Sequence, residues 1–540
     1  MSYGYNEDGI RLTLTYADGT VLATSYTGRN QVKDIIVVGP PPPISYTYDT
    51  AGNRVGRSLE NGTITAYSYD DAGRLASLEH KIGGVSLQRF DYTLNAQGSR
   101  TARVESNNSV AQTDVYTYDP SEQITQVKYN YNAGTGTQDR EVNYAYDAVG
   151  NRTAVTDNGT PTPYTANSLN QYMAIDAFAA PACDGNGNLT TLQSAVGAPV
   201  WTYNYDAQNR LTGGVSTSGD TFTFAYDPRN RCVVRTVGGT ATCYLYDDWN
   251  VIEDRSAADL QVAQYYQGAA VDEVIAAVNP NGTFFHHHDG LGSVTAVTDA
   301  TGAIAERVRY DVFGAPSFAD SANQPAASSP TGNRFLFTGR ELLPAGDGST
   351  IYDYRNRDYF PLIGRFAQPD PLGFDSGDEN LVRYVQNNPA TTIDPLGLWH
   401  TGAYARDDAS TIICDGHGKV IYHPPKPVPA HDVCCLPCFE AHENSHAEDA
   451  MAANPIVCVG KQRNIAVGFS NLSEQKRSEL MAHGKEKKCL ENLLKDRETK
   501  KSCLRDITAR LKRVNEVYIP TYNKFADDPT KPPVQVPWSL

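Results

Sequence analysis

A motif that recurs along the first half of the chain limits its fold more than any other feature of the sequence does. The motif is Tyr-x-Tyr-Asp or a close variant followed by a short turn, and its copies read YTYDTAGNRV (46–55), YSYDDAGRLA (67–76), YTYDPSEQIT (116–125), YAYDAVGNRT (144–153), YNYDAQNRLT (203–212), FAYDPRNRCV (224–233) and YLYDDWNVIE (244–253). Alternating aromatic and polar residues, punctuated by Gly, Asn and Asp, are typical of short strands joined by hairpin turns. One hairpin cannot bury its own apolar face, so the copies are predicted to stack into a mainly β array.

Charge and cysteine content divide the chain near residue 398. Residues 1–398 carry 26 basic and 44 acidic side chains, whereas residues 399–540 carry 20 and 18, together with seven of the ten cysteines. An acidic body argues against a nucleic-acid partner, because phosphate contacts require Lys and Arg, and the nearly neutral remainder has no dense basic run. No apolar run approaches the roughly 20 residues of a membrane span. The N-terminal MSYGYNEDGI has no basic-then-apolar signal peptide, so any export is expected to use another route.

The repeated units resemble the YD repeats of the RHS family, which includes bacterial polymorphic toxins, the C components of insecticidal toxin complexes and the animal teneurins. The resemblance continues in HHHDGLGSVTAVTDATGAIAERVRYDVFGAP (286–316), FLFTGRELL (335–343) and RFAQPDPLGFDSGDENLVRYVQNNPATTIDPLGL (365–398). It implies a large β-shell, coiled into a hollow barrel or cocoon, that encloses a C-terminal toxin and is delivered to a target cell by a specialised secretion route. A β-rich adhesive or carbohydrate-binding array is the alternative.

The resemblance implies four regions. Residues 1–40 would form a partial repeat, 41–330 the YD-repeat shell, 331–398 the core terminus with self-cleaving aspartates, and 399–540 the toxin domain. A shell of this length is short for a closed cocoon, so we expect either a partner that completes it or a longer parent protein. The family also has aromatic and His residues before GLGSV, which implies a structural role for His286, His287 and His288 rather than a metal site.

Two identical tetrapeptides, DPLG, begin at Asp370 and Asp394. Asp-Pro-x-Gly by itself is a turn. Two carboxylates in one site cannot both ionise cheaply, so one keeps a proton and can act as an acid while the other acts as a base. In RHS proteins the matching aspartates are implicated in self-cleavage, which places the cut here after Leu398 and starts the tail at Trp399. Arg365 matches a family arginine that supports this site.

The tail contains the H-E-x-x-H spacing of zinc peptidases. Residues 438–453 are predicted to form one helix, on which His442 and His446 lie one turn apart and could bind Zn²⁺. Glu443 would polarise the metal-bound water, and Asp449 lies on the same face. A solvated polar helix with stray histidines is the alternative.

A third zinc ligand is needed, and the sequence leaves it open. The position used by metzincins holds Ala452, which excludes that class. The next helix carries Glu479 and Glu486 on one face, and it resembles an HExxH-type toxin domain found at the ends of polymorphic toxins. Glu479 is the predicted ligand, with Glu486 or Asp449 as alternatives and the others as partners that orient a His ring.

The cysteines of the tail allow two arrangements. Disulfides among Cys438, Cys458, Cys489 and Cys503 could clamp the peptidase helix to its neighbour. A second, structural zinc bound through Cys435 and Cys438 is the alternative. Their connectivity is not readable from sequence.

Together these observations predict a secreted toxin whose shell frees a zinc metallopeptidase. An immunity protein that plugs the zinc cleft is the expected partner, and a protein is the default substrate. Two rivals stand beside this reading. One is a shell with a non-catalytic, disulfide-rich tip that binds a cell surface, and the other is a toxin of different chemistry in which H-E-x-x-H is accidental.

Overall fold

The computed structural model describes residues 1–7, 10–38, 44–107, 110–176, 178–344, 350–398, 411–414 and 420–423. The chain divides into two compact units, one of residues 1–16, 24–32 and 403–540, the other of residues 17–23 and 33–402. The predicted helix at 438–453 lies outside the described residues. Among the residues described, no helix is long and apolar enough to cross a membrane.

The first unit contains two described strand pairs. β1 (Ser2–Tyr5) pairs with β2 (Arg11–Thr15), and β36 (Thr411–Cys414) pairs with β37 (Val420–His423), both antiparallel. β3 (Val21–Tyr26) lies where the chain passes from the second unit back to the first, between Ala23 and Thr24.

The second unit begins with a run of antiparallel strands that lie side by side in chain order. These strands are β4 (Val32–Val38), β5 (Ile44–Tyr48), β6 (Arg54–Ser58), β7 (Thr63–Tyr69), β8 (Leu75–Ile82), β9 (Val85–Leu94), β10 (Arg100–Asn107), β11 (Val110–Tyr118), β12 (Ile124–Tyr129), β13 (Arg140–Tyr146), β14 (Arg152–Asp157), β15 (Thr160–Ala166) and β16 (Tyr172–Ile175).

A second sheet of fifteen strands follows, again in chain order. It consists of β17 (Ala182–Cys183), β18 (Leu189–Gln193), β19 (Val200–Tyr205), β20 (Leu211–Ser216), β21 (Thr221–Tyr226), β22 (Cys232–Val237), β23 (Thr240–Asp247), β24 (Asn250–Ser256), β25 (Gln261–Gln267), β26 (Val274–Asn279), β27 (Gly282–His288), β28 (Val294–Thr298), β29 (Ile304–Tyr310), β30 (Pro316–Asp320) and β31 (Pro325–Ala326). The predicted mainly β architecture is confirmed, as open antiparallel sheets rather than a closed barrel in the part of the chain that is described.

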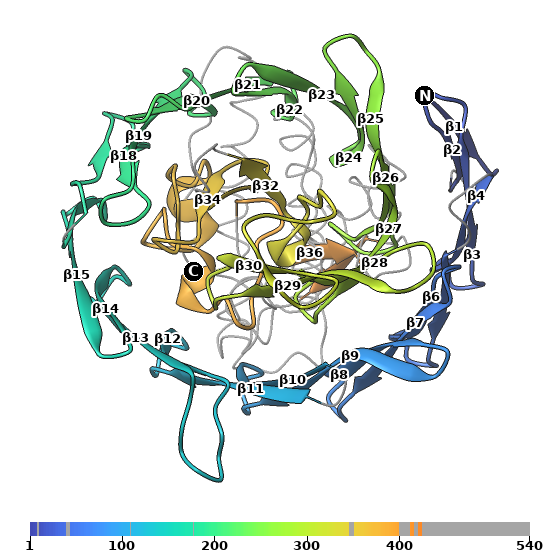
Figure 1. Ribbon diagram of the computed structural model, residues 1–540, viewed down its shortest axis with the longest axis horizontal. Helices are drawn as coiled ribbons and strands as arrows, with labels where there is room; N and C mark the ends of the chain where they lie inside the picture. Colours follow the sequence, from blue (N-terminus) through green and yellow to red (C-terminus); the bar gives the residue numbers. More distant parts are fainter. Residues whose placement is uncertain are drawn as a thin grey trace, which may run out of the picture. The chain divides into compact units, whose positions relative to one another are not determined.

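Strands β4 to β26, called the wall here, curve around the interior of the second unit, and β29 and β30 turn inward (Figure 1). Residues 331–398, called the plug, lie inside this curve. The plug holds a four-stranded sheet of β32 (Glu341–Pro344), β33 (Thr350–Asp353), β34 (Asp358–Phe360) and β35 (Arg365–Phe366), with the 3₁₀ turns η1 (Phe337–Gly339), η2 (Gly373–Ser376) and η3 (Val385–Asn387).

The tyrosines and aspartates of the repeat explain the strand spacing. In the first copy, Asp49 is the last residue of Tyr-x-Tyr-Asp. Its Oδ1 accepts a 2.8 Å hydrogen bond from the main-chain N–H of Asn53, and Gly52 between them has φ 92°. This turn follows a register shift at Thr47/Tyr48, which is the geometry of a short hairpin loop closed by a bulge.

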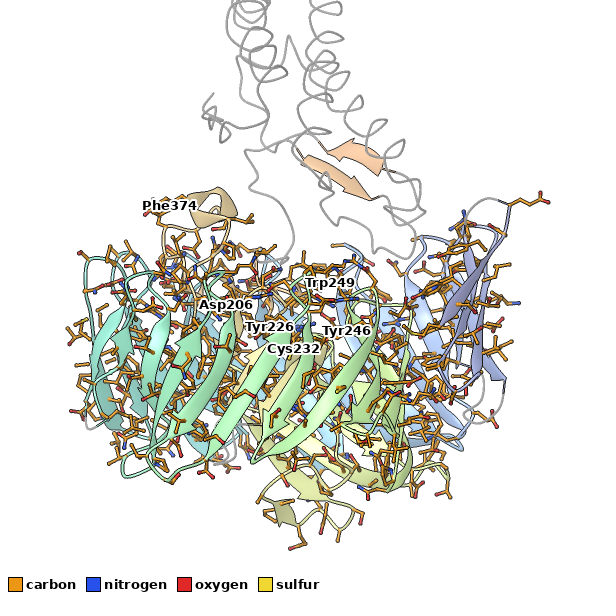
Figure 2. The ribbon with its side chains drawn as sticks, turned by 90° about the horizontal axis from the view of Figure 1, so that it is seen from above. Asp206, Tyr226, Cys232, Tyr246, Trp249 and Phe374 are labelled. Atoms are coloured by element: carbon orange, nitrogen blue, oxygen red, sulfur yellow. The ribbon has the colours of Figure 1, made fainter. Side chains whose placement is uncertain are left out.

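In six of the seven copies, the last tyrosine bonds back to the preceding strand. Tyr226 donates from its hydroxyl to the carbonyl of Leu211 at 2.7 Å, and Tyr246 donates to Cys232 at 2.6 Å. Both rings lie near the same edge of the wall (Figure 2). Five more tyrosines bond an earlier strand in the same way, namely Tyr69, Tyr118, Tyr146, Tyr205 and Tyr310. Each ring is partly or fully buried and thus packs apolar surface while its hydroxyl stays paired.

The plug packs against the inner faces of both sheets. Trp201 and Phe222 of the wall form one core with Phe360 of the plug, and the Tyr203 and Phe360 rings meet edge to face at 5.3 Å. On the other side Ala390 of the plug belongs to one core with Tyr144 of the first sheet and Phe313, which lies between β29 and β30 and whose ring is 5.2 Å from that of Tyr144. These aromatic contacts fill the centre of the second unit.

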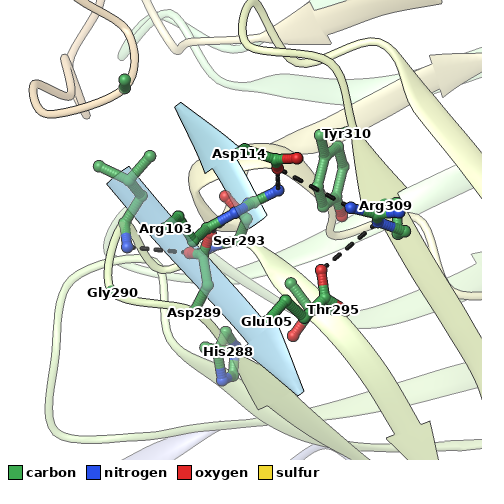
Figure 3. Close-up of polar contacts among 12 residues, drawn as sticks. Arg103, Glu105, Asp114, His288, Asp289, Gly290, Ser293, Thr295, Arg309 and Tyr310 are labelled. Atoms are coloured by element: carbon green, nitrogen blue, oxygen red, sulfur yellow. Dashed lines mark hydrogen bonds and ion pairs between the residues drawn. The ribbon is translucent and has the colours of Figure 1, made fainter. Parts of the chain in front are cut away.

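Buried ion pairs join the two sheets where β26 to β29 meet β6 to β11. Glu273 accepts hydrogen bonds of 2.8 and 2.9 Å from Arg54 and lies 3.2 Å from Arg57, whose side chain is fully buried. A second group surrounds Asp114, which lies 2.6 Å from Arg103 and 3.8 Å from Arg309 (Figure 3). Such pairs fix one geometry, because a buried charge without its partner is costly.

The three adjacent histidines lie in this junction. His286, His287 and His288 are buried in β27, and the ring of His80 from β8 lies 5.0 Å from that of His287. Burial lowers the pKa of His286 to about 4 and that of His80 to about 3, so these rings are neutral near pH 7. Among the described residues no group of His, Cys, Asp and Glu is arranged to hold a metal ion. His286 and His287 are buried and bond to Val274 and Thr298, so they pack as core residues.

Candidate functional site

Both DPLG segments of the plug fold as turns, and each turn is built around its aspartate. Asp370 follows β35, and its Oδ1 accepts from the N–H of Leu372 at 2.9 Å. Asp394 follows η3, and its Oδ1 accepts from the N–H of Leu398 at 3.3 Å. The carboxylate of Asp394 therefore lies beside the residue after which cleavage is predicted.

The two turns meet at one guanidinium. Nη2 of Arg357 lies 3.0 Å from Oδ2 of Asp370 and 3.2 Å from Oδ2 of Asp394, so the two carboxylates share a single cation. All three side chains are buried. Asp370 and Asp394 are 24 residues apart in the chain and form one acidic pair in the fold. The role of this pair in self-cleavage stays a prediction.

Burial raises the pKa of Asp370 to about 6, against the opposing effect of Arg357, and Asp394 adds to the rise. A carboxyl group with a pKa of this value can hold or release a proton close to neutral pH. This is the property that a general acid or base needs, and it arises from burial beside a second carboxylate.

A small cavity lies at the pair. Its volume is about 20 Å³, and its lining includes Arg357, Asp370, Asp394, Ser376, Asp378 and Asn380. That volume is sufficient for one water molecule, and the lining offers it several polar partners. Phe374, in the turn that follows Asp370, is 73% exposed and projects from the second unit (Figure 2).

The segment that leads to the predicted cut is held by its backbone. Nδ2 of Asn356 donates to the carbonyl of Leu396 at 3.0 Å, and Nε of Arg357 donates to the carbonyl of Gly397. Nη1 of Arg355 donates to the carbonyl of Pro395. Three consecutive side chains therefore hold three consecutive carbonyls, and Leu398 comes next. Trp399, on the far side of the predicted cut, lies outside the described residues.

Arg365, the arginine expected to support this site, lies elsewhere in the plug. Its guanidinium donates to Asn151 and Asn170 and stacks on the ring of Tyr172 at 3.7 Å. It thus joins the plug to the wall, and the arginine that contacts both aspartates is Arg357. Sequence reasoning missed Arg357, whose only signal was the run RNR in a segment that continues no repeat.

The predicted metal site and the tail cysteines lie outside the described residues and stay predictions. They are His442, Glu443, His446, Asp449, Glu479, Glu486, Cys435, Cys438, Cys458, Cys489 and Cys503.

The curved wall, the inner plug and the paired aspartates define a β-repeat shell protein with a candidate self-processing site. The Teneurin YD-shell family matches residues 99–389, more than half of the chain, and the RHS repeat matches residues 48–85. The chain therefore belongs to the YD-shell family.

Curated relatives share the shell and differ in their named activities. The chain is 28% identical over 414 residues to the tRNA3(Ser)-specific nuclease WapA of Bacillus spizizenii, a match that covers 74% of this chain and 16% of that protein. It is 23% identical to the toxin subunit YenC1 of Yersinia entomophaga, with 66% and 42% covered. It is 24% identical to the double-stranded DNA deaminase toxin A of Burkholderia cenocepacia, with 67% and 22% covered. The chain thus spans less than half the length of these relatives.

Solved structures show the same fold. The Tc holotoxin pore of Photorhabdus luminescens matches with a TM-score of 0.61 at 19% identity, covering 75% of this chain and 21% of that chain. The crystal structure of TcdB2-TccC3-Cdc42 matches with a TM-score of 0.60 at 20% identity, covering 73% and 21%.

Proposed function

We propose that this protein is a shell toxin that cuts its own chain after Leu398 and frees residues 399–540 as an enzymatic payload. The observation that supports the cut is the geometry of the plug. Two buried carboxylates, Asp370 and Asp394, share the cation of Arg357 beside a segment whose carbonyls are held up to Gly397. The names of the relatives support a toxin role.

Cleavage of the bond after Leu398 would follow the logic of a carboxylate pair. One carboxylate accepts a proton from water as the water oxygen bonds to the Leu398 carbonyl carbon. The other, which we assign as Asp370 because of its raised pKa, donates its proton as the C–N bond breaks and the new amine leaves. Arg357 holds both groups in place and balances their negative charge.

We propose a zinc metallopeptidase as the payload, on the strength of the H-E-x-x-H spacing. His442, His446 and Glu479 would hold Zn²⁺, with Glu486 or Asp449 as alternatives to Glu479. The metal, when bound, would supply an acidic water near neutral pH. Glu443 would accept the proton of that water, and a protein would be the substrate.

A second payload class is favoured by the relatives. Their names describe a tRNA nuclease, probable deoxyribonucleases and a DNA deaminase, which act on nucleic acids. The nearly neutral charge of residues 399–540 argues the other way. Partners are proposed on the same basis: an immunity protein for the payload and a shell-completing or delivery subunit.

The cut is tested by mass spectrometry of the purified full chain under denaturing conditions. The wild type is expected to give two polypeptides that part between Leu398 and Trp399, and Asp370→Asn and Asp394→Asn are expected to give one. Asp378→Asn is the matched control, because Asp378 lines the same cavity but pairs with Arg383 at 2.7 Å. An intact wild-type chain, or cleavage in either aspartate variant, would refute the proposal.

The payload is tested on the same preparations. A peptidase predicts one zinc per chain, lost in His446→Ala, and protein hydrolysis that disappears in Glu443→Gln. Nucleic-acid degradation or deamination that survives Glu443→Gln would establish the second class instead.

A further inference from the structure

We propose that Asp272 and Arg355 form a positioning relay that allows self-cleavage only when the wall loop 268–273 is seated on the plug. The inference rests on the proposed cut after Leu398 and adds its regulation. Asp272 stands between β25 and β26 of the wall, and Arg355 stands in the plug turn between β33 and β34. The relay would make release of the payload depend on assembly of its container.

The plug turn that carries Arg355, Asn356 and Arg357 has an unusual backbone conformation. Arg355 has φ 70°, a left-handed conformation that is uncommon for a residue with a long side chain. The turn is closed by the N–H of Tyr354, which donates to the carbonyl of Arg357 at 3.0 Å. Residues in such conformations persist when their surroundings hold them. Asp353 holds the main chain of Arg355 by accepting from its N–H, and the far end of the Arg355 side chain is anchored separately.

Asp272 provides that anchor. Its carboxylate accepts from both Nη atoms of Arg355, and the Oδ2–Nη1 distance is 3.3 Å. The same carboxylate accepts from Nη1 of Arg340, the residue that follows η1, at 2.9 Å. Both arginine side chains are buried. Asp272 thus fixes two arginines of the plug from the wall.

The loop and the plug approach each other closely at this point. A Cβ atom added to Gly339 would lie 2.1 Å from the carbonyl oxygen of Asp272, so only glycine permits the contact. Gly339 also has φ 73°. The wall loop that carries Asp272 therefore packs directly on η1 of the plug, and the Asp272–Arg355 contact is part of the same packed interface.

The relay ends on the segment that is cut. Nη1 of Arg355, held by Asp272, donates to the carbonyl of Pro395. Pro395 is the first of the three residues, 395–397, whose carbonyls are held by plug side chains. Without Asp272 the guanidinium would lose its buried counter-ion and its orientation. The segment would then be held at two carbonyls rather than three, and a misplacement of about 1 Å can slow a reaction by about a hundredfold.

The matched comparison is a second ion pair between wall and plug. Asp254 of β24 binds Arg334 of the plug, with an Oδ1–Nη2 distance of 2.8 Å, and both are buried. Arg334 bonds Asp254, Tyr265 and Glu341, and none of these three residues belongs to residues 394–398. Loss of Asp254 therefore removes a similar wall–plug contact from outside the relay.

The experiment measures the rate at which the newly made full chain is cut, by following intact and cleaved chains through time after synthesis stops. Asp272→Asn is expected to slow the cut by about ten- to a hundredfold. Asp254→Asn is expected to stay within about twofold of the wild type, and Asp272→Glu is expected to regain part of the rate. Protection of β25 and β26 from hydrogen exchange reports the folded fraction of each variant. Each cleavage rate is divided by that fraction.

Two results would overturn the relay. One is an Asp272→Asn chain that is cut at the wild-type rate, and the other is equal slowing in Asp254→Asn, which would trace the effect to stability. A third comparison separates the relay from the proposed cut. Asp394→Asn must abolish cleavage for the proposed function to hold, whatever Asp272→Asn does. The pH dependence of cleavage should keep its midpoint in Asp272→Asn, because the contacts of Asp370 are unchanged.

Discussion

Glu273 is the shared counter-ion of two arginines on the opposite sheet, and its replacement by glutamine gives a demanding test of the structure. The substitution keeps the shape of the side chain and removes one charge. Arg57, whose side chain is fully buried, and Arg54, which is 23% exposed, would then face each other without a carboxylate. The main-chain N–H of Ala270, which donates to Glu273 at 2.9 Å, would keep an acceptor.

The expected loss follows from that burial. Breaking a buried ion pair by removing one partner costs about 3–5 kcal/mol, because the remaining charge stays desolvated. Burial alone would raise the pKa of Glu273, but Arg54 and Arg57 outweigh it and hold that pKa below its usual value. Glu273 therefore stabilises the fold above its unfolded-state pKa, and this contribution is lost as the pH falls through the folded-state pKa.

The assay is hydrogen exchange of the native protein at β6 and β26 at pH 7, together with thermal unfolding. Glu273→Gln should lower the protection of both strands by about 3–5 kcal/mol. Asp157→Asn is the control: Asp157 pairs with Arg140 at 2.7 Å, but both are more than 40% exposed, and such pairs contribute at most about 1 kcal/mol. Equal effects of the two substitutions would show that the junction between the sheets is not held by this charge.

Further predictions concern the histidines, the cut and the repeats. The pKa of His286 is lowered to about 4, so as the pH drops below about 6.5 the unfolded chain binds a proton at this histidine before the folded chain does, and stability falls. His286→Gln should reduce the slope of the unfolding free energy against pH by about 1.4 kcal/mol per pH unit, measured in urea titrations. If Asp370 donates the proton, the rate of self-cleavage should fall as the pH rises above about 6, and a rate that rises instead would reverse its assigned role. Gly397→Ala should slow the cut at least about tenfold, because the new Cβ would lie 2.5 Å from the Tyr354 carbonyl oxygen. Gly373→Ala in the other DPLG turn is the control: both glycines have positive φ, 62° and 57°, so alanine is strained at either position, but its Cβ meets no atom within 4 Å at Gly373 and the cut should be faster than in Gly397→Ala. Tyr226→Phe should cost about 1 kcal/mol in urea unfolding through the lost bond to Leu211, and no loss would mean that the hydroxyl only packs.

The repeated strands and turns were predictable because their determinants are local. A tyrosine such as Tyr226 alternates with polar neighbours, and the aspartate that follows caps its own turn, so the signal is complete within ten residues. The pairing of that tyrosine with a carbonyl 15 residues earlier needed the structure, since periodicity gives the face of a strand and not the partner of its hydroxyl.

The candidate site was predictable only in part. The duplicated DPLG marked Asp370 and Asp394, and the structure places them on one cation. The cation itself is Arg357 rather than Arg365. The sequence could not show this, since both arginines are buried and only tertiary packing decides which of them reaches the pair. Asp272 was invisible for the same reason: its partners stand 68 and 83 residues away in the chain.

The three hydrogen bonds to the main-chain carbonyls of residues 395–397 all lie on the N-terminal side of the predicted cut, and that position has an evolutionary consequence. None of these bonds places a demand on the sequence that is joined after Leu398. Recombination at this junction could exchange one cargo for another without any compensating change in the shell. Under the proposed function, the shell could therefore stay unchanged in evolution while the domain that follows Leu398 is replaced.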